Sequence, residues 1–246
     1  MNLLKLKPKG RFVFVGDTHG DLDASKKVIK KYLDKNTTIS FLGDYVDRGV
    51  NSKENVEYLI EKKKENPKRI NLLQGNHERY DVLEISDADF WGSLNLDERK
   101  KYSNIFKKFP LVISVGGIIA LHGALPNVEK LEDINKIEDS PPDQNWLTTL
   151  WGDFEEGINY EDDGDWVYSR DRPTFGKEYF ERIMKKLNKN VLIRSHDSLA
   201  RQVMFDNKCL TIFTSNAYNR VRQVAIVDFD KKKKIESIDD LVIEEI

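Results

Sequence analysis

The stretch Phe12-Val13-Phe14-Val15-Gly16-Asp17-Thr18-His19-Gly20 joins four apolar residues to a short polar segment. The apolar part has the length and β-branched character that are typical of a buried strand. Gly16 and Gly20 would let the backbone turn sharply and approach a small ligand closely. Asp17 and His19 are two residues apart, so at an extended strand end both side chains point the same way. The stretch therefore predicts a strand that carries an aspartate and a histidine at its carboxyl end.

Polar residues follow four further apolar runs in the same way. The runs and the segments after them are Ile39–Leu42 with Gly43-Asp44-Tyr45-Val46-Asp47-Arg48-Gly49, Ile70–Leu73 with Gln74-Gly75-Asn76-His77-Glu78, Ile118–Leu121 with His122-Gly123, and Val191–Ile193 with Arg194-Ser195-His196-Asp197. All four histidines of the chain lie at, or within four residues of, the end of an apolar run. In open α/β sheets, ligands bind beyond the carboxyl ends of the strands. The pattern therefore predicts one site at a shared edge.

Short apolar runs alternate with helical patterns along the chain. Strands are expected at Phe12–Val15, Thr38–Leu42, Ile70–Leu73, Leu111–Val115, Ile118–Leu121, Val191–Ile193, Leu210–Thr214 and Val224–Phe229. Helices are expected at about Leu22–Leu33, from Ser52 to just before Pro67, at Leu96–Phe109 and at Lys177–Leu187. The early alternation of strand and helix predicts a largely parallel first sheet, and the closer succession of later strands favours antiparallel pairs. Without a repeat or a low-complexity linker, we expect one domain over residues 1–246.

Composition narrows the class of protein. The chain has 246 residues with 40 Lys and Arg against 42 Asp and Glu, a net charge of −2, so no global basic field favours nucleic acid as a partner. One cysteine, Cys209, excludes an intrachain disulfide framework and a thiolate zinc cage. No apolar run approaches the ~20 residues of a membrane helix, and the first ten residues resemble no secretory signal. We therefore expect a cytoplasmic protein that does not bind a membrane.

The side chains that follow the strands have the chemistry of metal ligands. Carboxylate, amide and imidazole donors without a thiolate suit divalent ions such as Mn, Fe or Zn. The donors are too many for one tetrahedral catalytic site, whereas two metal ions that share a bridging carboxylate fit their number. The candidate ligands are Asp17, His19, Asp44, Asn76, His122 and His196.

Three of these segments carry a resemblance to a known family. Gly16-Asp17-x-His19-Gly20, Gly43-Asp44-x-Val46-Asp47-Arg48-Gly49 and Gly75-Asn76-His77-Glu78 resemble the three-part signature of the phosphoprotein phosphatase (PPP) family of serine/threonine phosphatases, in the dimetal metallophosphoesterase superfamily. His122-Gly123, Leu150-Trp151-Gly152-Asp153 and Arg194-Ser195-His196 extend the match, which spans residues 12 to 219. The resemblance implies a calcineurin-like α/β fold of two packed mixed β-sheets flanked by helices. It also implies the metal-dependent hydrolysis of phosphoserine and phosphothreonine in proteins.

The resemblance implies how the ligands divide between two divalent metal ions. Asp44 would bridge the two ions. A hydroxide that bridges them would be the nucleophile, so no phosphoenzyme is expected, and the metal would be Mn in vitro, with Fe or Zn as further candidates. The first ion would be held by Asp17, His19 and Asp44, and the second by Asp44, Asn76, His122 and His196.

The same resemblance implies roles in proton transfer and phosphate binding. His77 would be the general acid that protonates the leaving alkoxide, and Asp47 would hold its ring, which suits a side chain that titrates near neutral pH. Arg48 and Asn76 would contact the phosphate of a phosphoprotein substrate. The sequence identifies no regulatory subunit.

A second phosphate-binding arginine is expected shortly before Phe175-Gly176. The alignment is ambiguous between Arg170 and Arg172, and we favour Arg170. The stretch 153–165 holds seven acids and no Lys or Arg; we expect a solvated loop and hypothesise that it overhangs the cleft and favours substrates with basic flanks. Tyr218 either borders the cleft or packs at a strand end.

Other functions remain as alternatives. A dinucleoside tetraphosphate hydrolase of the same superfamily commonly carries aspartate where this chain has Glu78. A metallo-dependent nuclease is disfavoured because the chain lacks a basic patch. A catalytically inactive scaffold that binds phosphoproteins is disfavoured because every expected ligand and His77 are present. A cysteine-based phosphatase would need an arginine six positions after Cys209, where Ser215 stands.

Overall fold

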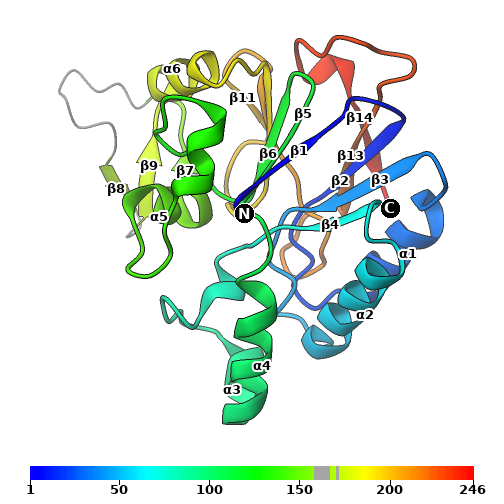
Figure 1. Cartoon of the computed structure of the whole chain (residues 1–246), viewed down its shortest axis with the longest axis vertical. Helices are drawn as coiled ribbons and strands as arrows, with labels where there is room; N and C mark the ends of the chain where they lie inside the picture. Colours follow the sequence, from blue (N-terminus) through cyan, green and yellow to red (C-terminus); the bar gives the residue numbers. More distant parts are fainter. Residues whose placement is uncertain (158–166, 170–171) are drawn as a thin grey trace.

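The computed structural model describes residues 1–157, 167–169 and 172–246. Two β-sheets pack face to face, with a small third sheet beside them (Figure 1). The first sheet has the order β1-β5-β6-β10-β12-β11, with β1 (Leu3–Leu6), β5 (Val112–Val115), β6 (Ile118–Leu121), β10 (Val191–Arg194), β11 (Val203–Met204) and β12 (Cys209–Thr211). The second has the order β14-β13-β2-β3-β4, with β2 (Arg11–Val15), β3 (Thr37–Phe41), β4 (Ile70–Leu72), β13 (Gln223–Asp228) and β14 (Val242–Glu245). The third has the order β7-β9-β8, with β7 (Asp153–Phe154), β8 (Val167–Ser169) and β9 (Arg172–Phe175).

Helices cover the outer face of each large sheet (Figure 1). α1 (Leu22–Tyr32) and α2 (Ser52–Glu65) pack on the second sheet, and α5 (Gln144–Trp151) and α6 (Lys177–Lys186) pack on the first. α3 (Asp89–Ser93) and α4 (Leu96–Phe106) lie beyond the end of β4. Three short 3-10 helices complete the elements: η1 (His77–Arg79), η2 (Leu131–Lys136) and η3 (Ile238–Asp240). Within the residues that the structure describes, no helix combines the length and apolar character needed to cross a membrane.

Strand β2 shows why the fold needs uninterrupted apolar runs. Phe12 and Phe14 face the first sheet and belong to the cluster between the sheets. Val13 and Val15 point the other way, into the cluster beneath α1 and α2. Because successive side chains alternate between faces and both faces are buried, every position of the run must be apolar.

The predicted fold class is confirmed, and each predicted strand and helix has a counterpart with small shifts at its ends. β2, β3 and β4 are parallel, as the early alternation predicts. The expectation of antiparallel pairs among the later strands holds for β5 and β6 but is wrong for β10, which runs parallel to both β6 and β12. The chain between β6 and β10 crosses over through α5, the third sheet and α6, and such a crossover returns it to the same end of the sheet.

Replacing Phe14 with alanine is expected to lower the free energy of unfolding by about 3–5 kcal/mol, because a ring with 0% exposure leaves a cavity between the sheets. Urea unfolding followed by circular dichroism measures the loss. Leu96→Ala is the control, since Leu96 is 74% exposed and should change stability by no more than about 0.5 kcal/mol. Equal losses in the two variants would contradict this packing.

Candidate metal centre and active site

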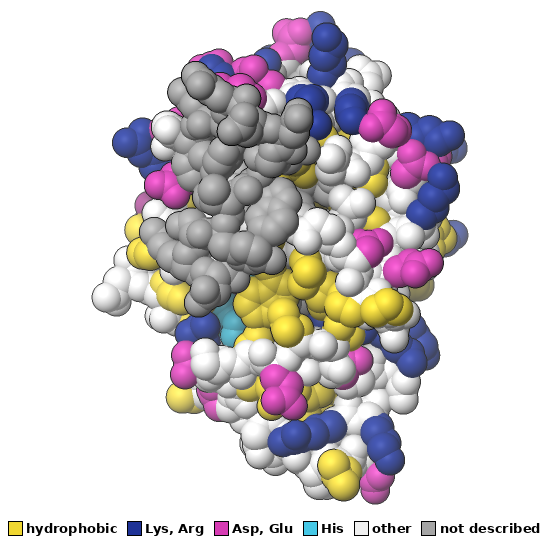
Figure 2. Space-filling view, turned by 90° about the vertical axis from the view of Figure 1, so that its left-hand side faces the viewer, with side chains coloured by type: hydrophobic (Ala, Val, Ile, Leu, Met, Phe, Trp, Pro, Cys, Tyr) yellow, Lys and Arg dark blue, Asp and Glu magenta, His cyan; other side chains and the backbone are white. Residues whose placement is uncertain are grey.

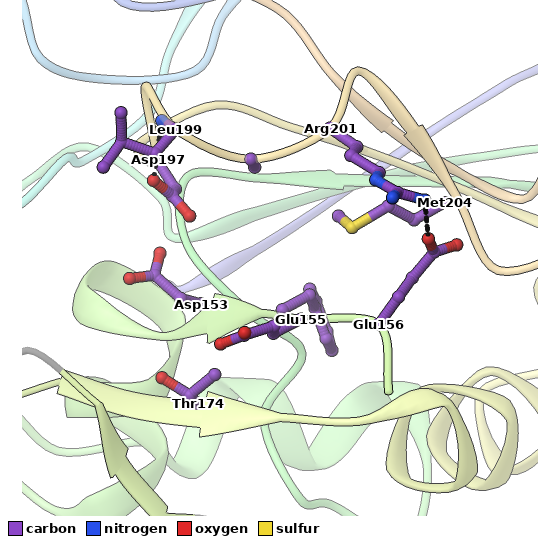
Figure 3. Close-up of a pocket in the computed structure, with 10 residues that line it drawn as sticks. Asp153, Glu155, Glu156, Thr174, Asp197, Leu199, Arg201 and Met204 are labelled. Atoms are coloured by element: carbon purple, nitrogen blue, oxygen red, sulfur yellow. Dashed lines mark hydrogen bonds and ion pairs between the residues drawn. The ribbon is translucent and has the colours of Figure 1, made fainter. Parts of the chain in front are cut away.

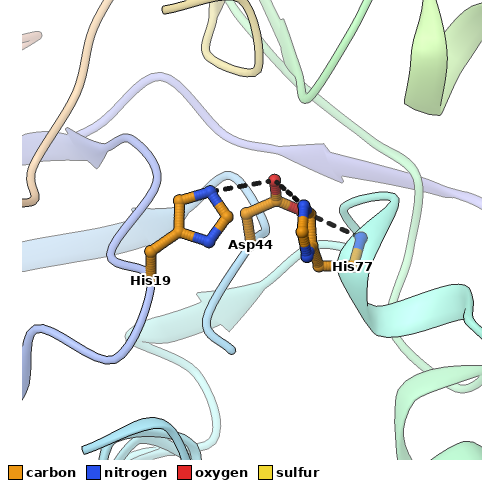
Figure 4. A group of neighbouring side chains, drawn as sticks. All are labelled: His19, Asp44 and His77. Carbon is orange, nitrogen blue, oxygen red and sulfur yellow. Dashed lines mark hydrogen bonds and ion pairs between the residues drawn. The ribbon is translucent and has the colours of Figure 1, made fainter. Parts of the chain in front are cut away.

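Five strand ends, those of β2, β3, β4, β6 and β10, converge on one buried carboxylate. Oδ2 of Asp44 lies 3.4 Å from Nε2 of His19 and 4.0 Å from Nε2 of His77 (Figure 4). It also lies 3.4 Å from Nε2 of His122. The loops thus place three imidazoles around the Asp44 side chain.

The other candidate ligands surround this centre. Asn76 Oδ1 lies 2.9 Å and His196 Nδ1 lies 3.1 Å from Nε2 of His122. Asp17 Oδ2 lies 3.8 Å from Nε2 of His19. All six side chains that the sequence predicts as ligands therefore lie in one cluster, and each of them is buried.

Two groups in this cluster have the spacing to hold metal ions. His19, Asp44 and His77 form one, and Asp44, His122 and His196 form the other, with ligand atoms within 4.8 Å of one another in each group. The groups share Asp44, which is the residue expected to bridge. The first group contains His77, which the resemblance assigns to proton transfer, in the place of Asp17.

Backbone carbonyls orient two of the histidine rings. His19 Nδ1–H donates to Val46 O at 2.8 Å, and His122 Nδ1–H donates to Leu42 O at 3.0 Å. The remaining nitrogen of each ring, Nε2, then faces Asp44 Oδ2 at 3.4 Å. Metal-binding histidines are commonly held in this way.

The charges of the cluster also match a cation. Asp17 Oδ2 is buried and has no hydrogen-bond partner among the described residues. Burial, together with the neighbouring Asp44 carboxylate, raises the pKa of Asp17 to about 6. Burial lowers the pKa of His19 to about 3, which keeps that ring in the neutral form that a metal ligand needs. Oxygen and nitrogen donors without a thiolate fit divalent cations, so this cluster fits two such ions that share Asp44.

Hydrogen bonds hold both the ring and the backbone of His77 in place. Its Nδ1 lies 2.8 Å from Oδ2 of Asp47, and its backbone N–H donates to Asp44 Oδ1 at 3.1 Å. Burial alone would lower the pKa of His77, but the Asp44 and Asp47 carboxylates raise it. Asp47 is itself held by the backbone N–H of Phe90, and Trp91 Nε1–H donates to the carbonyl of His77. The sequence alone did not predict that α3 supports the site. The adjacent aromatic residues Phe90 and Trp91 were the feature that could have indicated a buried helix there.

A cavity of about 610 Å³ opens over the cluster, and Asn76, His77, Arg48 and Arg172 are among its lining residues. Figure 2 shows part of a histidine set back in a hollow, beside a band of hydrophobic side chains. Arg172 Nη1–H donates to Nε2 of His196 at 3.2 Å. Arg170 lies outside the described residues, so the preference for Arg170 over Arg172 stays a prediction.

Tyr218 borders this site. Its hydroxyl lies 3.2 Å from Nε2 of His19, and the Arg48 guanidinium lies 5.7 Å from the centre of its ring. The structure shows both placements that the sequence left open for Tyr218, because its ring also packs edge-on against Phe213 after β12, with the ring centroids 5.6 Å apart.

A second, acidic pocket of about 250 Å³ adjoins the cluster through Asp153 (Figure 3). The expectation of a solvated loop is wrong for Asp153, which is 5% exposed. Its Oδ1 lies 3.1 Å from Nη2 of the buried Arg194, and its Oδ2 lies 3.7 Å from Nη1 of Arg172. These two guanidinium groups compensate the buried carboxylate. The acids from 161 to 165 lie outside the described residues.

Glu78 ties the loops of the site together. Its Oε2 accepts the backbone N–H groups of Asp44 at 2.7 Å and Gly75 at 2.9 Å, and its Oε1 accepts that of Tyr45 at 2.8 Å. Burial and the Asp44 carboxylate raise its pKa, and the backbone N–H groups of Tyr45 and Asp44 oppose that rise by stabilising the ionised form. Sequence reasoning used Glu78 only to separate families and missed this positioning role.

The loops adopt strained backbone conformations. His19, Asp44, Asp47, Arg48 and His196 have φ values between 39° and 71°, in the left-handed region that disfavours residues with a Cβ. Gly75 makes room for one of them, because a Cβ there would lie 2.3 Å from Asp44 Oδ1.

Comparisons with known proteins match most of the chain. The model of the calcineurin-like phosphoesterase family matches residues 10–198. A probable serine/threonine-protein phosphatase of Encephalitozoon cuniculi is 29% identical over 234 residues, which cover 88% of this chain and 49% of the relative. The chain thus spans about half the length of that curated relative.

Solved structures share the fold. A Saccharomyces cerevisiae protein serine/threonine phosphatase with similarity to human phosphatase PP5 has a TM-score of 0.80 and 22% identity over 99% of this chain and 82% of its own. A putative diadenosine tetraphosphatase has a TM-score of 0.58 and 15% identity over 99% and 97%. The fold and the family match define the class: this chain belongs to the calcineurin-like phosphoesterase family.

Replacing Glu78 with glutamine is expected to lower the free energy of unfolding by about 2–3 kcal/mol, because an NH₂ group would face a backbone N–H donor in a buried position. Urea unfolding measures the change. Glu61→Gln makes the same substitution on the exposed surface of α2 and should leave stability within about 0.5 kcal/mol of the wild type. Unchanged stability in Glu78→Gln would show that the three backbone contacts do not hold the loops.

Proposed function

We propose that this chain is a metal-dependent phosphatase that hydrolyses phosphoserine and phosphothreonine in proteins. One observation carries the proposal: His77, hydrogen-bonded to Asp47, lies against the carboxylate that the two candidate metal groups share. The name of the microsporidian relative supports proteins as the substrate class. The three apolar clusters, which link both sheets to their helices, support the further proposal that residues 1–246 form one domain.

The cluster supplies the ligands for two divalent ions, for which we propose Mn²⁺ in vitro. Asp17, His19 and Asp44 would hold one ion, and Asp44, Asn76, His122 and His196 the other. When bound, such ions activate water for attack and neutralise charge on the phosphoryl oxygens.

His77 is placed to move a proton at Nε2. Its Nδ1–H donates to Asp47, which fixes the tautomer and leaves Nε2 to face the cavity. The Asp44 and Asp47 carboxylates raise the pKa of His77 and so favour the doubly protonated ring, which would donate its Nε2 proton to the seryl or threonyl oxygen as the bond to phosphorus breaks and keep the Nδ1–H toward Asp47. Such an oxygen is a poor leaving group as an alkoxide, so its protonation lowers the barrier.

Two arginines would bind the phosphate. Arg48 and Arg172 both line the cavity, and their planar guanidinium groups suit bidentate contacts with phosphate oxygens. Asp153 and Trp151 hold Arg172: Asp153 Oδ2 lies 3.7 Å from its Nη1, and its guanidinium lies 5.8 Å from the Trp151 ring. Arg172 is thus placed for this role, and Arg170, which the sequence favours, stays the other candidate.

Replacing His77 with asparagine is expected to lower kcat on a phosphothreonine peptide by a factor on the order of 10² or more, as the loss of a general acid should. The loss should be smaller on p-nitrophenyl phosphate, whose leaving group needs no proton. Steady-state kinetics on both substrates and the bound metal per chain provide the readouts. Near-normal turnover of the peptide by a metal-loaded variant would remove His77 from this role.

The substrate class is tested by phosphate release after chelation and Mn²⁺ add-back. We expect hydrolysis of a phosphothreonine peptide that chelation abolishes and Mn²⁺ restores, with little cleavage of diadenosine tetraphosphate run beside it. Dinucleotide cleavage with little peptide activity would leave the metal cluster in place but transfer the function to nucleotide hydrolysis.

A further inference from the structure

A groove separate from the candidate active site lies between the edge strands β1 and β4 of the two large sheets. Among the described strands, β1 and β4 each have one neighbour, so each forms an edge of its sheet. Figure 1 shows the start of β1 near β4. The cavity between them has a volume of about 510 Å³ and is formed by residues from β1, β4, the turn after α2 and the segment before β5.

The floor of this groove is apolar. Leu4 and Leu6 of β1 pack against the apolar cluster between the sheets. Both side chains are only half-buried, so part of their apolar surface stays exposed to the groove. Phe109 and Pro110 form one end, where their carbonyls accept hydrogen bonds from the side chain and the backbone of Gln74. A partner that covers this floor would remove apolar surface from water.

The rim of the groove is basic. Lys63, Lys68 and Lys108 line it, and no Asp or Glu does. Within the described part of the chain, none of the three lysines has a carboxylate within ion-pair distance; Lys63 Nζ instead donates to the carbonyl of Pro67 at 3.0 Å. This cluster of uncompensated positive charge occurs on a chain whose net charge is −2. It complements a partner that carries carboxylates.

The number of charges on the rim separates the candidate occupants. Leu72 of β4 lines the groove but is only 2% exposed, so the apolar floor and the lysine rim, and not backbone pairing with β4, would hold a partner. A peptide can present aliphatic side chains to the floor and a separate carboxylate to each of the three lysines, whereas a fatty acid carries one carboxylate and a phosphate carries no aliphatic group.

We propose that this groove is a docking site for an extended peptide segment of a partner protein in which acidic residues alternate with aliphatic ones. Aliphatic side chains would cover Leu4, Leu6 and Phe109, and the acidic side chains would reach the three lysines. The groove lies outside the phosphatase cavity, so the inference does not depend on the proposed function.

The test uses fluorescein-labelled decapeptides of alternating Glu and Val or Ile, and matched peptides with Lys in place of Glu, in fluorescence polarisation with the full chain. We expect the acidic peptides to bind and the basic ones not to bind. Hydrogen exchange should slow at residues 67–73 and 108–110 when the acidic peptide is present. Binding should weaken as salt is raised, because the lysines are exposed or half-exposed.

The variant Lys63→Glu/Lys68→Glu/Lys108→Glu should bind the acidic peptides at least ten-fold more weakly and should gain affinity for the basic ones. Lys185→Glu/Lys208→Glu/Lys233→Glu is the matched control, since it changes net charge equally at exposed lysines outside the groove. An equal loss in both triple variants would reduce the effect to overall charge and overturn the proposal. Preference for the basic peptides, binding of dodecanoate without peptide binding, or no binding by any acidic peptide would overturn it as well.

Discussion

The site depends on one buried carboxylate that accepts three backbone N–H groups. Glu78 receives those of Asp44 and Tyr45 after β3 and that of Gly75 after β4. These bonds hold the two loops at a fixed separation, and the loops carry Asp44 and His77 toward each other. A carboxylate can satisfy several donors at once because each of its oxygens has two lone pairs.

The loops around Glu78 adopt strained backbone conformations that bring the candidate metal-binding side chains together. Five site residues occupy the left-handed region of backbone space, which costs on the order of 1 kcal/mol or more for each residue with a Cβ. Hydrogen bonds such as that from His19 Nδ1 to Val46 O hold these conformations in place. The two packed sheets supply the rigid support that makes such strain tolerable.

The same sandwich gives the molecule two distinct surfaces. At the carboxyl ends of its parallel strands, loops fill the edge with polar side chains and form the cluster around Asp44. On the side where β1 and β4 end the two sheets, Leu4 and Leu6 leave an apolar groove with a lysine rim. One surface presents oxygen and nitrogen donors that suit divalent cations, and the other presents apolar side chains beside three lysines.

The sequence by itself predicted the central strands of the two large sheets, their order along the chain and the side chains at their ends, but it did not predict β1, β7, β8, β9, β11 or β14. An apolar run such as Phe12–Val15 can be buried on both faces only inside a layered fold, and the residues that end it must then lie at one edge. Only the tertiary structure decided that β10 runs parallel to β6, that Asp153 is buried against Arg194, and that Glu78 holds Asp44. Each of these contacts joins residues more than 30 positions apart, and local patterns of hydrophobicity carry no information about which distant backbone groups a polar side chain will meet.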